Sequence, residues 1–90
     1  MSDTHPKLSV IMPCYNVADT LDRAVQSILM QQVNFPYEII MVDDASTDDT
    51  TKMLDAYEKK YSQVRVIRHE ENQGNAIAFY NGLSAAQGDY

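Results

Sequence analysis

Two adjacent carboxylates, Asp43 and Asp44, are the residues of this chain best placed to do chemistry. They directly follow an uninterrupted apolar run, Ile39–Val42, which suits a strand buried on both faces of a parallel sheet. Acids at the carboxyl end of such a strand point into the crevice where open α/β sheets bind ligands, and can accept hydrogen bonds from a ribose hydroxyl or a base imide. The alternative is structural, because Asp also caps turns. That alternative is stronger for Asp43, since the first acid of such a pair often anchors nearby amides.

Residues in two other loops are predicted to share this crevice. Tyr15 follows the first apolar segment, Leu8–Met12, where its ring either stacks on a base or packs on the sheet edge. Gly74 lies in the loop Asn72–Asn75 and lets the backbone approach a ligand closely. Free amides at the start of the following helix can face an anion there, although most such glycines only make a turn.

Several other classes of site are disfavoured by the residue pattern. Residues Pro13–Thr20 read PCYNVADT, so the glycine-rich phosphate loops of dehydrogenases and P-loop NTPases are not present there. His5 and His69 lack companion ligands at metal spacing, so we expect each to be solvated or to act as a cap. Cys14 has no nearby histidine or second cysteine, and we expect a small buried filler. A phosphoacceptor signalling domain would carry its acid pair after the first strand, where this chain has Pro13.

Length and charge restrict the partners that we expect. Ninety residues allow one small domain. The formal charge of −6, from 13 acidic and 7 basic residues, argues against nucleic acid bound by a broad basic surface. A single cysteine excludes an internal disulfide framework and fits a reducing, cytoplasmic location. No segment reaches the roughly 18 apolar residues of a membrane helix.

Alternating strands and helices must position these side chains. In chain order, we expect a strand at Leu8–Met12, a helix from Asp19 or Thr20 to a stop at Asn34–Pro36, a strand at Ile39–Val42, a helix at Thr47–Tyr61, a strand at Val64–Ile67 and a helix at Asn75–Gln87. This β-α-β-α-β-α order predicts an α/β fold, a three-layer, Rossmann-like parallel sheet.

The ends of several elements carry recognisable signals. Pro13 is expected to end the first strand, because it lacks an amide hydrogen. Ser46 or Thr47 is expected to cap the second helix. Residues 1–7 are expected to be a disordered lead, and Gly88–Tyr90 resembles the turn into a fourth strand. The chain is therefore expected to be the front part of a longer protein.

Three motifs in this order and spacing resemble one family, the inverting glycosyltransferases of family 2, which have the GT-A fold. The motifs are LSVIMPCYN at Leu8–Asn16, EIIMVDDASTD at Glu38–Asp48, and Asn72-x-Gly74 followed by Ala78, Gly82, Ala85 and Gly88–Tyr90. The resemblance covers residues 8–90. It implies the N-terminal, nucleotide-binding half of a GT-A domain, truncated before the Asp-x-Asp segment.

The resemblance implies a nucleotide site at the residues already singled out. The position matching Asp44 contacts the base, usually uracil, and Asp43 lies beside it. The loop matching Pro13–Tyr15 packs against the base, and residues from Asn72 to Gly74 frame the nucleotide. The implied reaction is inverting transfer from a sugar nucleotide, expected to be a UDP-sugar, to a hydroxyl of a saccharide or lipid-linked acceptor.

The resemblance also implies what residues 1–90 should lack. In the family, an Asp-x-Asp segment holds Mg²⁺ or Mn²⁺ on the diphosphate, and a later carboxylate deprotonates the acceptor. Both are expected beyond residue 90, so we expect no catalytic residue and no metal ligand within the chain. Regions outside it could place the protein at the cytoplasmic face of a membrane. The alternative is a non-catalytic nucleotide- or partner-binding module of the same fold.

The chain departs from the family pattern at two places. Val17 and Ala18 stand where an acidic residue is common, and Phe79 and Tyr80 stand where the family often has an Asn, sometimes preceded by Arg. The second departure argues against a polar contact from that turn of the third helix and does not affect Asp43 and Asp44. The family's strand order places the first strand beside a fourth one, so Leu8–Met12 is expected to be an uncovered edge that promotes self-association.

Overall fold

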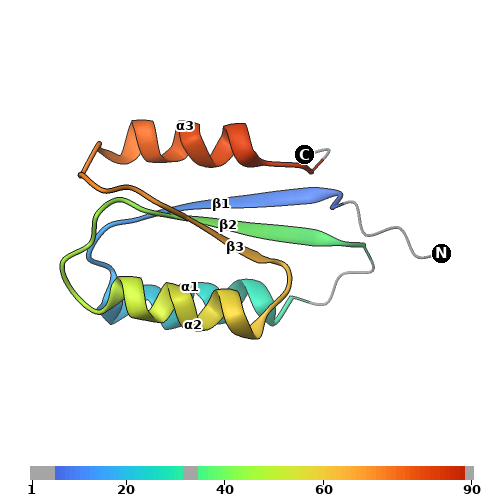
Figure 1. Cartoon of the computed structure of the whole chain (residues 1–90). Helices are drawn as coiled ribbons and strands as arrows, with labels where there is room; N and C mark the ends of the chain where they lie inside the picture. Colours follow the sequence, from blue (N-terminus) through green and yellow to red (C-terminus); the bar gives the residue numbers. More distant parts are fainter. Residues whose placement is uncertain (1–5, 32–34, 89–90) are drawn as a thin grey trace.

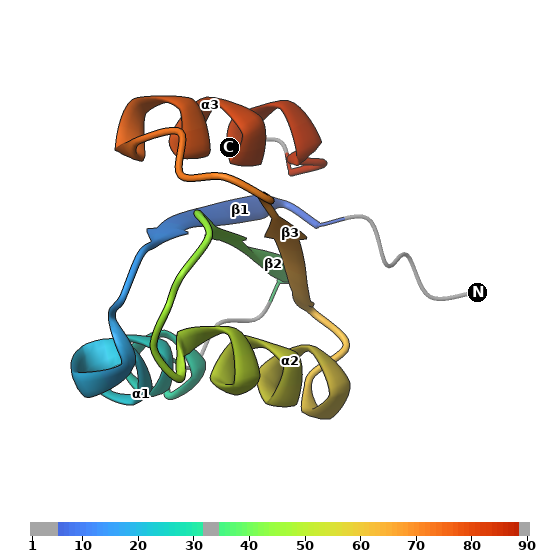
Figure 2. The same ribbon diagram turned by 60° about the vertical axis from the view of Figure 1, so that its left-hand side comes forward.

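The structure is a computed structural model that describes residues 6–31 and 35–88. Within these residues, strands and helices alternate in the order β1 (Leu8–Cys14), α1 (Ala18–Leu29), β2 (Tyr37–Asp43), α2 (Thr50–Lys60), β3 (Val64–Arg68) and α3 (Asn75–Ala85). The strands are parallel and lie in the order β1-β2-β3. Helices α1 and α2 cover one face of the sheet and α3 covers the other (Figures 1 and 2). The predicted three-layer α/β fold is confirmed.

The central strand, β2, is buried on both faces because its apolar run is continuous. Residues Ile39–Val42 are all 0% exposed. Side chains alternate along a strand, so the odd-numbered residues pack into the cluster with α1 and α2, and the even-numbered residues pack against Ala78 of α3. The same alternation directs Asp43 towards α2 and Asp44 towards the start of α3. Two adjacent acids therefore have different surroundings.

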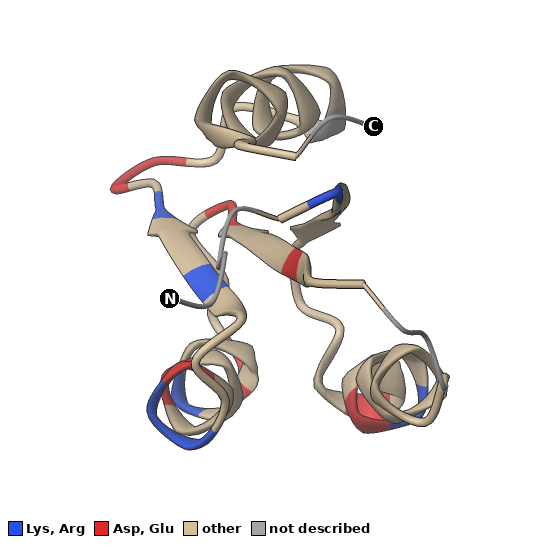
Figure 3. Cartoon of the chain, turned by 90° about the vertical axis from the view of Figure 1, so that its right-hand side faces the viewer, with Lys and Arg blue, Asp and Glu red and all other residues tan. Residues whose placement is uncertain are grey.

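Helix α3 lies close to the sheet because small residues face it. Ala78 is fully buried, and Gly82, one turn later, lies on the same side of the helix. A Cβ on Gly82 would be 2.6 Å from Ile11 Cγ2 and 3.1 Å from Val42 Cγ2. The outer side of α3 carries no charge (Figure 3) and exposes four large apolar side chains: Ile77, Phe79, Tyr80 and Leu83.

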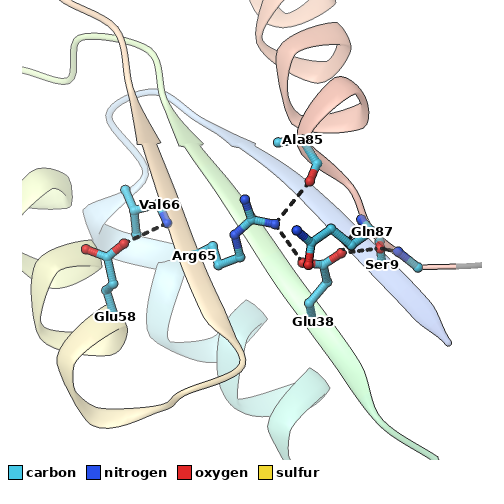
Figure 4. Close-up of polar contacts among 8 residues, drawn as sticks. Ser9, Glu38, Glu58, Arg65, Val66, Ala85 and Gln87 are labelled. Atoms are coloured by element: carbon cyan, nitrogen blue, oxygen red, sulfur yellow. Dashed lines mark hydrogen bonds and ion pairs between the residues drawn. The ribbon is translucent and has the colours of Figure 1, made fainter. Parts of the chain in front are cut away.

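A buried carboxylate, Glu38, ties the amino ends of the strands to the end of α3. It is 4% exposed and accepts hydrogen bonds from Ser9 Oγ at 2.7 Å, Gln87 N at 2.6 Å and Arg65 Nη1 at 3.0 Å (Figure 4). Arg65 also donates to the carbonyl of Ala85 at 3.0 Å. Burial on its own raises the pKa of Glu38, but the hydrogen bonds from Ser9, Gln87 and Arg65 outweigh it and lower the pKa.

The first strand is longer than predicted. Pro13 does not end β1, which pairs with β2 as far as Cys14. The Cys14 carbonyl accepts a hydrogen bond from Asp44 N at 2.9 Å, so the backbone of Cys14 faces β2 and that of Pro13 faces the free edge. A missing amide hydrogen costs no ladder hydrogen bond at an edge.

The start of the second helix also differs from the prediction. Helix α2 begins at Thr50 instead of Thr47, and its N-cap, Asp49, makes no side-chain capping bond. Neither Ser46 nor Thr47 caps it. Both hydroxyls instead accept hydrogen bonds from Asn16 in the loop after β1.

Most of the other limits shift by one or two residues. Helix α1 begins at Ala18, β3 extends to Arg68, and α3 ends at Ala85 because the Gln87 amide is donated to Glu38. The predicted stop of the first helix at Asn34–Pro36 was wrong, because α1 already ends at Leu29. Asn34 itself and most of the predicted lead lie outside the described residues. No helix within residues 6–31 and 35–88 is long and apolar enough to cross a membrane.

Candidate functional site

Asp44 lies buried at the carboxyl edge of the sheet, directly after β2. It is 1% exposed, and its Oδ1 accepts a hydrogen bond from Gln73 N at 2.8 Å and lies 2.8 Å from His69 Nδ1. Its Oδ2 accepts from Gly74 N at 2.8 Å, and Asn72 Nδ2 donates to the Asp44 carbonyl at 3.3 Å. Burial alone raises the pKa of Asp44, but the bonds from His69, Gln73 and Gly74 outweigh it and lower the pKa. The site thus holds an ionised acceptor.

The loop before α3 wraps around this carboxylate. Gly74 has φ 90° and ψ 157°, a conformation that glycine adopts readily and other residues rarely. It brings two successive amides, of Gln73 and Gly74, onto the two oxygens of one carboxylate. The amides that the sequence suggested could face an anion therefore face Asp44 of the same chain.

Asp43 has an anchoring role in the turn that leads into α2. It is 3% exposed, its Oδ1 accepts from Ser46 N at 3.0 Å, and its Oδ2 accepts from Thr51 Oγ1 at 2.6 Å. This matches the structural alternative that the sequence left open for Asp43. The hydrogen bonds of Asp43 hold the loop that follows Asp44 in place.

Asn16 joins the loops that follow β1 and β2. Its side-chain Oδ1 accepts hydrogen bonds from Thr47 N at 2.7 Å and Asp48 N at 3.3 Å, and its backbone N donates to Ser46 Oγ at 3.1 Å. Its φ of 51° lies in the left-handed region, which Asn tolerates better than most residues. The sequence placed Asn16 in a motif but gave it no role.

Tyr15 and Pro13 lie at the same edge of the sheet, at the end of β1. Tyr15 is 44% exposed, so one part of its ring is free to contact a ligand. Pro13 is partly buried and lies opposite Val42 in the ladder, and the next pair is Cys14 with Asp43. The predicted residues of the first loop therefore lie beside the acid pair in the sheet.

His69 is the site residue that the sequence prediction missed. Its side chain is only 6% exposed and contacts two other side chains, so the expectation of a solvated or capping histidine was wrong. It contacts Asp44, and its Nε2 lies 2.8 Å from Asn81 Nδ2. A signal existed, because His69 directly follows β3, and the carboxyl ends of parallel strands share one edge.

Cys14 is buried, as predicted, and it is chemically inactive. It is 1% exposed, and burial, together with the negative charge of Asp43, raises the pKa of its thiol to about 11. A thiol with this pKa is almost wholly protonated at neutral pH and is a poor nucleophile.

No metal cluster surrounds Asp44 in the described part of the chain. The described residues contain no group of three or more His, Cys, Asp or Glu side chains that could hold a metal ion. Two surface hollows, of about 410 and 570 Å³, include Tyr37 at the start of β2, at the opposite edge of the sheet, and neither is lined by Asp44.

A parallel sheet with a buried acid at the carboxyl end of its central strand defines an α/β ligand-binding fold. The model of the family described as "Glycosyl transferase family 2" matches residues 9–90. The chain belongs to this family.

Two bacterial relatives support this assignment. TuaG of Bacillus subtilis (strain 168), named as a glycosyltransferase of teichuronic acid biosynthesis, is 42% identical over 90 residues, which are 100% of this chain and 35% of TuaG. Glycosyltransferase GlyG of Streptococcus pneumoniae is 42% identical over 84 residues, which are 92% of this chain and 27% of GlyG. The chain thus spans about a third of these relatives.

Solved structures share the fold. TarS 1–349 of S. aureus in complex with UDP has a TM-score of 0.79 and 32% identity, over 91% of this chain and 25% of that one. The mannosyltransferase PcManGT from Pyrobaculum calidifontis, in complex with GDP-Man and Mn²⁺, has a TM-score of 0.77 and 28% identity, over 91% of this chain and 25% of that one. The predicted N-terminal, Rossmann-like part of a GT-A fold is confirmed.

Proposed function

We propose that residues 8–90 form the nucleotide-binding part of a glycosyltransferase that uses a UDP-sugar. The reaction is inverting transfer of the sugar to a hydroxyl of a saccharide or lipid-linked acceptor. The observation that carries this proposal is the buried, ionised carboxylate of Asp44 at the carboxyl edge of the sheet. A UDP complex of TarS, which shares the fold, supports uridine as the nucleoside.

The hydrogen bonds of Asp44 leave room for one more donor. A carboxylate offers about four acceptor positions. Among the side chains and amides that the structure describes, Oδ1 has two neighbouring donors, Gln73 N and His69 Nδ1, whereas Oδ2 has one, Gly74 N. The free position on Oδ2 suits the imide N–H of uracil, and a hydrogen bond to a charged acceptor contributes about 1.5–3 kcal/mol.

The surrounding residues have supporting roles in this proposal. Tyr15 stacks on the base, with Pro13 holding its loop at the sheet edge. Asn72 and Gly74 frame the nucleotide, and Asp43 fixes the neighbouring turn. Because Asp44 is only 1% exposed, entry of the base requires side chains that cover Asp44 to shift.

A divalent metal ion, Mg²⁺ or Mn²⁺, belongs to the proposed reaction but does not fit the acids described here. The carboxylates of Asp43 and Asp44 both accept hydrogen bonds from protein donors, and a magnesium or calcium site needs several free oxygen ligands. We therefore place the metal ligands and the catalytic base outside residues 1–90. The PcManGT complex with Mn²⁺ supports a metal-dependent reaction.

Replacement of the key carboxylate tests the proposal. Asp44→Asn should weaken UDP binding by roughly tenfold or more, because one charge-assisted hydrogen bond is lost. The affinity is measured by NMR titration of this chain, and by calorimetry in a longer protein that carries it. Asp49→Asn, the same change at an exposed acid, is the matched control and should bind as the unchanged chain does. Equal affinities in both variants would remove Asp44 from the site.

A further inference from the structure

A histidine and an asparagine from two further elements extend the site beyond Asp44. His69 follows β3 and lies with its Nδ1 2.8 Å from Asp44 Oδ1, and Asn81 of α3 lies with its Nδ2 2.8 Å from His69 Nε2. The His69 side chain is 6% exposed and that of Asp44 is 2% exposed. The loops after β2 and β3 and helix α3 thus contribute one residue each to a row of polar side chains, in which Asp44 and His69 are buried and Asn81 is partly buried.

The chemistry of these groups fixes the direction of the hydrogen bonds. The structure orients the Asn81 amide with Nδ2 towards His69 Nε2; in this orientation Nδ2 can only donate, so Nε2 accepts and carries no proton. A neutral imidazole then has its proton on Nδ1, and it donates that proton to Asp44, which as a carboxylate only accepts. The order of donation is Asn81 to His69 to Asp44.

This order determines which oxygen of Asp44 is free. With His69 as a donor, Oδ1 accepts two hydrogen bonds, from His69 and from Gln73 N. From the described donors, Oδ2 accepts one hydrogen bond, that of Gly74 N, and keeps one position. Without the His69 donor, both oxygens would have one free position, and the carboxylate would present no single acceptor to a ligand.

We propose that His69, held in its Nδ1–H tautomer by Asn81, is a positioning residue that directs Asp44 Oδ2 at the base of the nucleotide. This role rests on the proposed binding of a base at Asp44. It adds one specificity element directly after β3 and one on α3 to a site otherwise made by the loops after β1 and β2 and before α3. It also gives a role to Asn81, a polar residue in a helix with no charged residues.

The tautomer is measured directly, without a ligand. The chain has two histidines, so long-range ¹H–¹⁵N spectra contain two imidazole rings, and His5→Gln identifies that of His69. We expect a protonated Nδ1 and an unprotonated Nε2 for His69. Asn81→Asp, which can only accept from Nε2, should place a proton on Nε2. An Nε2–H tautomer in the unchanged chain would overturn the proposal.

The effect on recognition is measured by NMR titration with uridine. His69→Asn places an amide N–H close to the position of Nδ1 and should bind uridine within about threefold of the unchanged chain. His69→Leu fills a similar volume without a donor and should bind roughly tenfold more weakly. Circular dichroism verifies the fold of each variant, and His69→Asn remains informative if His69→Leu does not fold.

The outcomes separate this inference from the proposed function. If the unchanged chain binds uridine and the Leu variant, once folded, binds it equally well, His69 has no positioning role and the proposed function stands. If His69→Asn binds as weakly as a His69→Ala variant, the retained donor is not what matters, and the inference fails. If the unchanged chain shows no response even at uridine concentrations well above the millimolar range expected for the chain alone, the proposed function fails, and the role of His69 in base recognition fails with it.

Discussion

Glu38 and Asp44 lie at opposite ends of β2 on the same face, and hydrogen bonds lower the pKa of both against the effect of burial. A carboxyl whose pKa is lower in the folded state than in the unfolded state stabilises the fold above its unfolded pKa. That contribution is lost as the pH falls through the folded pKa. For Glu and Asp, the unfolded values are about 4.3 and 3.9. The loss therefore begins near pH 4 and continues below it.

We expect the free energy of unfolding to change little between pH 7 and 5 from these two groups, and to fall below about pH 4. Glu38→Gln should lose about 1–3 kcal/mol at pH 7, because a buried charged acceptor with three donors is replaced. Its stability should also fall less steeply in acid. Urea unfolding at pH 7, 5 and 3 measures both effects.

Glu71→Gln is the control for this experiment, because Glu71 is exposed. It should resemble the unchanged chain at each pH. Equal acid sensitivity of Glu38→Gln and the unchanged chain would show that Glu38 does not contribute to the pH dependence.

At the scale of residues, the sequence allowed prediction of the residues whose roles depend on their neighbours along the chain. The position of Asp44 follows from the apolar run before it. Cys14 was expected to be a buried filler because no histidine or second cysteine lies near it in the sequence. His69 and Glu38 escaped prediction because their partners are distant in the chain. Glu38 is 49 residues from Gln87, and His69 is 25 residues from Asp44. Only the strand order brings these groups together.

At the scale of elements, the contact of α3 with the sheet depends on the absence of a side chain at one position. A methyl group on Gly82 would lie 2.6 Å from Ile11 Cγ2, well inside the normal contact distance of about 3.5 Å. Ala is a better helix former than Gly by about 1 kcal/mol, so propensity and packing oppose each other at this position.

Gly82→Ala should therefore lower stability, because overpacking costs about 1–3 kcal/mol and exceeds or cancels the propensity gain. The control is Ser84→Ala in the same helix, where the side chain is exposed and only propensity changes. Thermal unfolding should show a lower midpoint for Gly82→Ala and an unchanged or higher one for Ser84→Ala. A rise for both would mean that α3 moves away from the sheet at little cost.

The order and type of the elements were predictable, whereas their limits depended on tertiary contacts. Hydrophobic runs and helical periodicity are local signals, and they placed all six elements correctly. The predicted start of α2 was wrong because Ser46 and Thr47, which are good caps in isolation, accept hydrogen bonds from Asn16 in another loop. Pro13 remains in β1 because β1 is an edge strand.

At the scale of the whole molecule, two apolar features are uncovered among the described residues. β1 has one strand neighbour, and α3 exposes Ile77, Phe79, Tyr80 and Leu83. An open strand edge and an exposed apolar face both favour association between copies. A charge of −6 opposes it, and salt screens that repulsion.

We expect the 90-residue chain to self-associate, and to do so more strongly at higher salt, as measured by light scattering. Leu83→Lys places a charge on α3 and leaves the edge of β1 unchanged. Association that persists in this variant indicates the strand edge, whereas its loss indicates the helix face. A clean monomer at high concentration in high salt would argue against both.

Nucleotide binding by the chain alone should be weak. The contacts proposed for Tyr15 and Asp44 reach only the nucleoside, and the net charge of −6 repels a diphosphate. We expect a dissociation constant for UDP in the millimolar range at best, which corresponds to a binding free energy of about −4 kcal/mol. Addition of Mn²⁺ should change this constant little. NMR titration with and without the metal measures this. Micromolar, metal-dependent binding would mean that residues 1–90 hold a complete site.

The two ends of α3 are attached to the sheet by contacts that are distant along the chain. At one end, the loop before the helix bonds to Asp44, 30 residues from Gly74, and at the other, Gly88 N bonds to Ser9 Oγ across 79 residues. Closing so long a loop is entropically costly, so the sheet and its other two helices should form before α3 docks. We therefore expect α3 to dock last during folding and to detach from the sheet as one cooperative unit. Detachment of α3 would break the hydrogen bonds from the preceding loop to Asp44 and expose one face of the sheet at the same time.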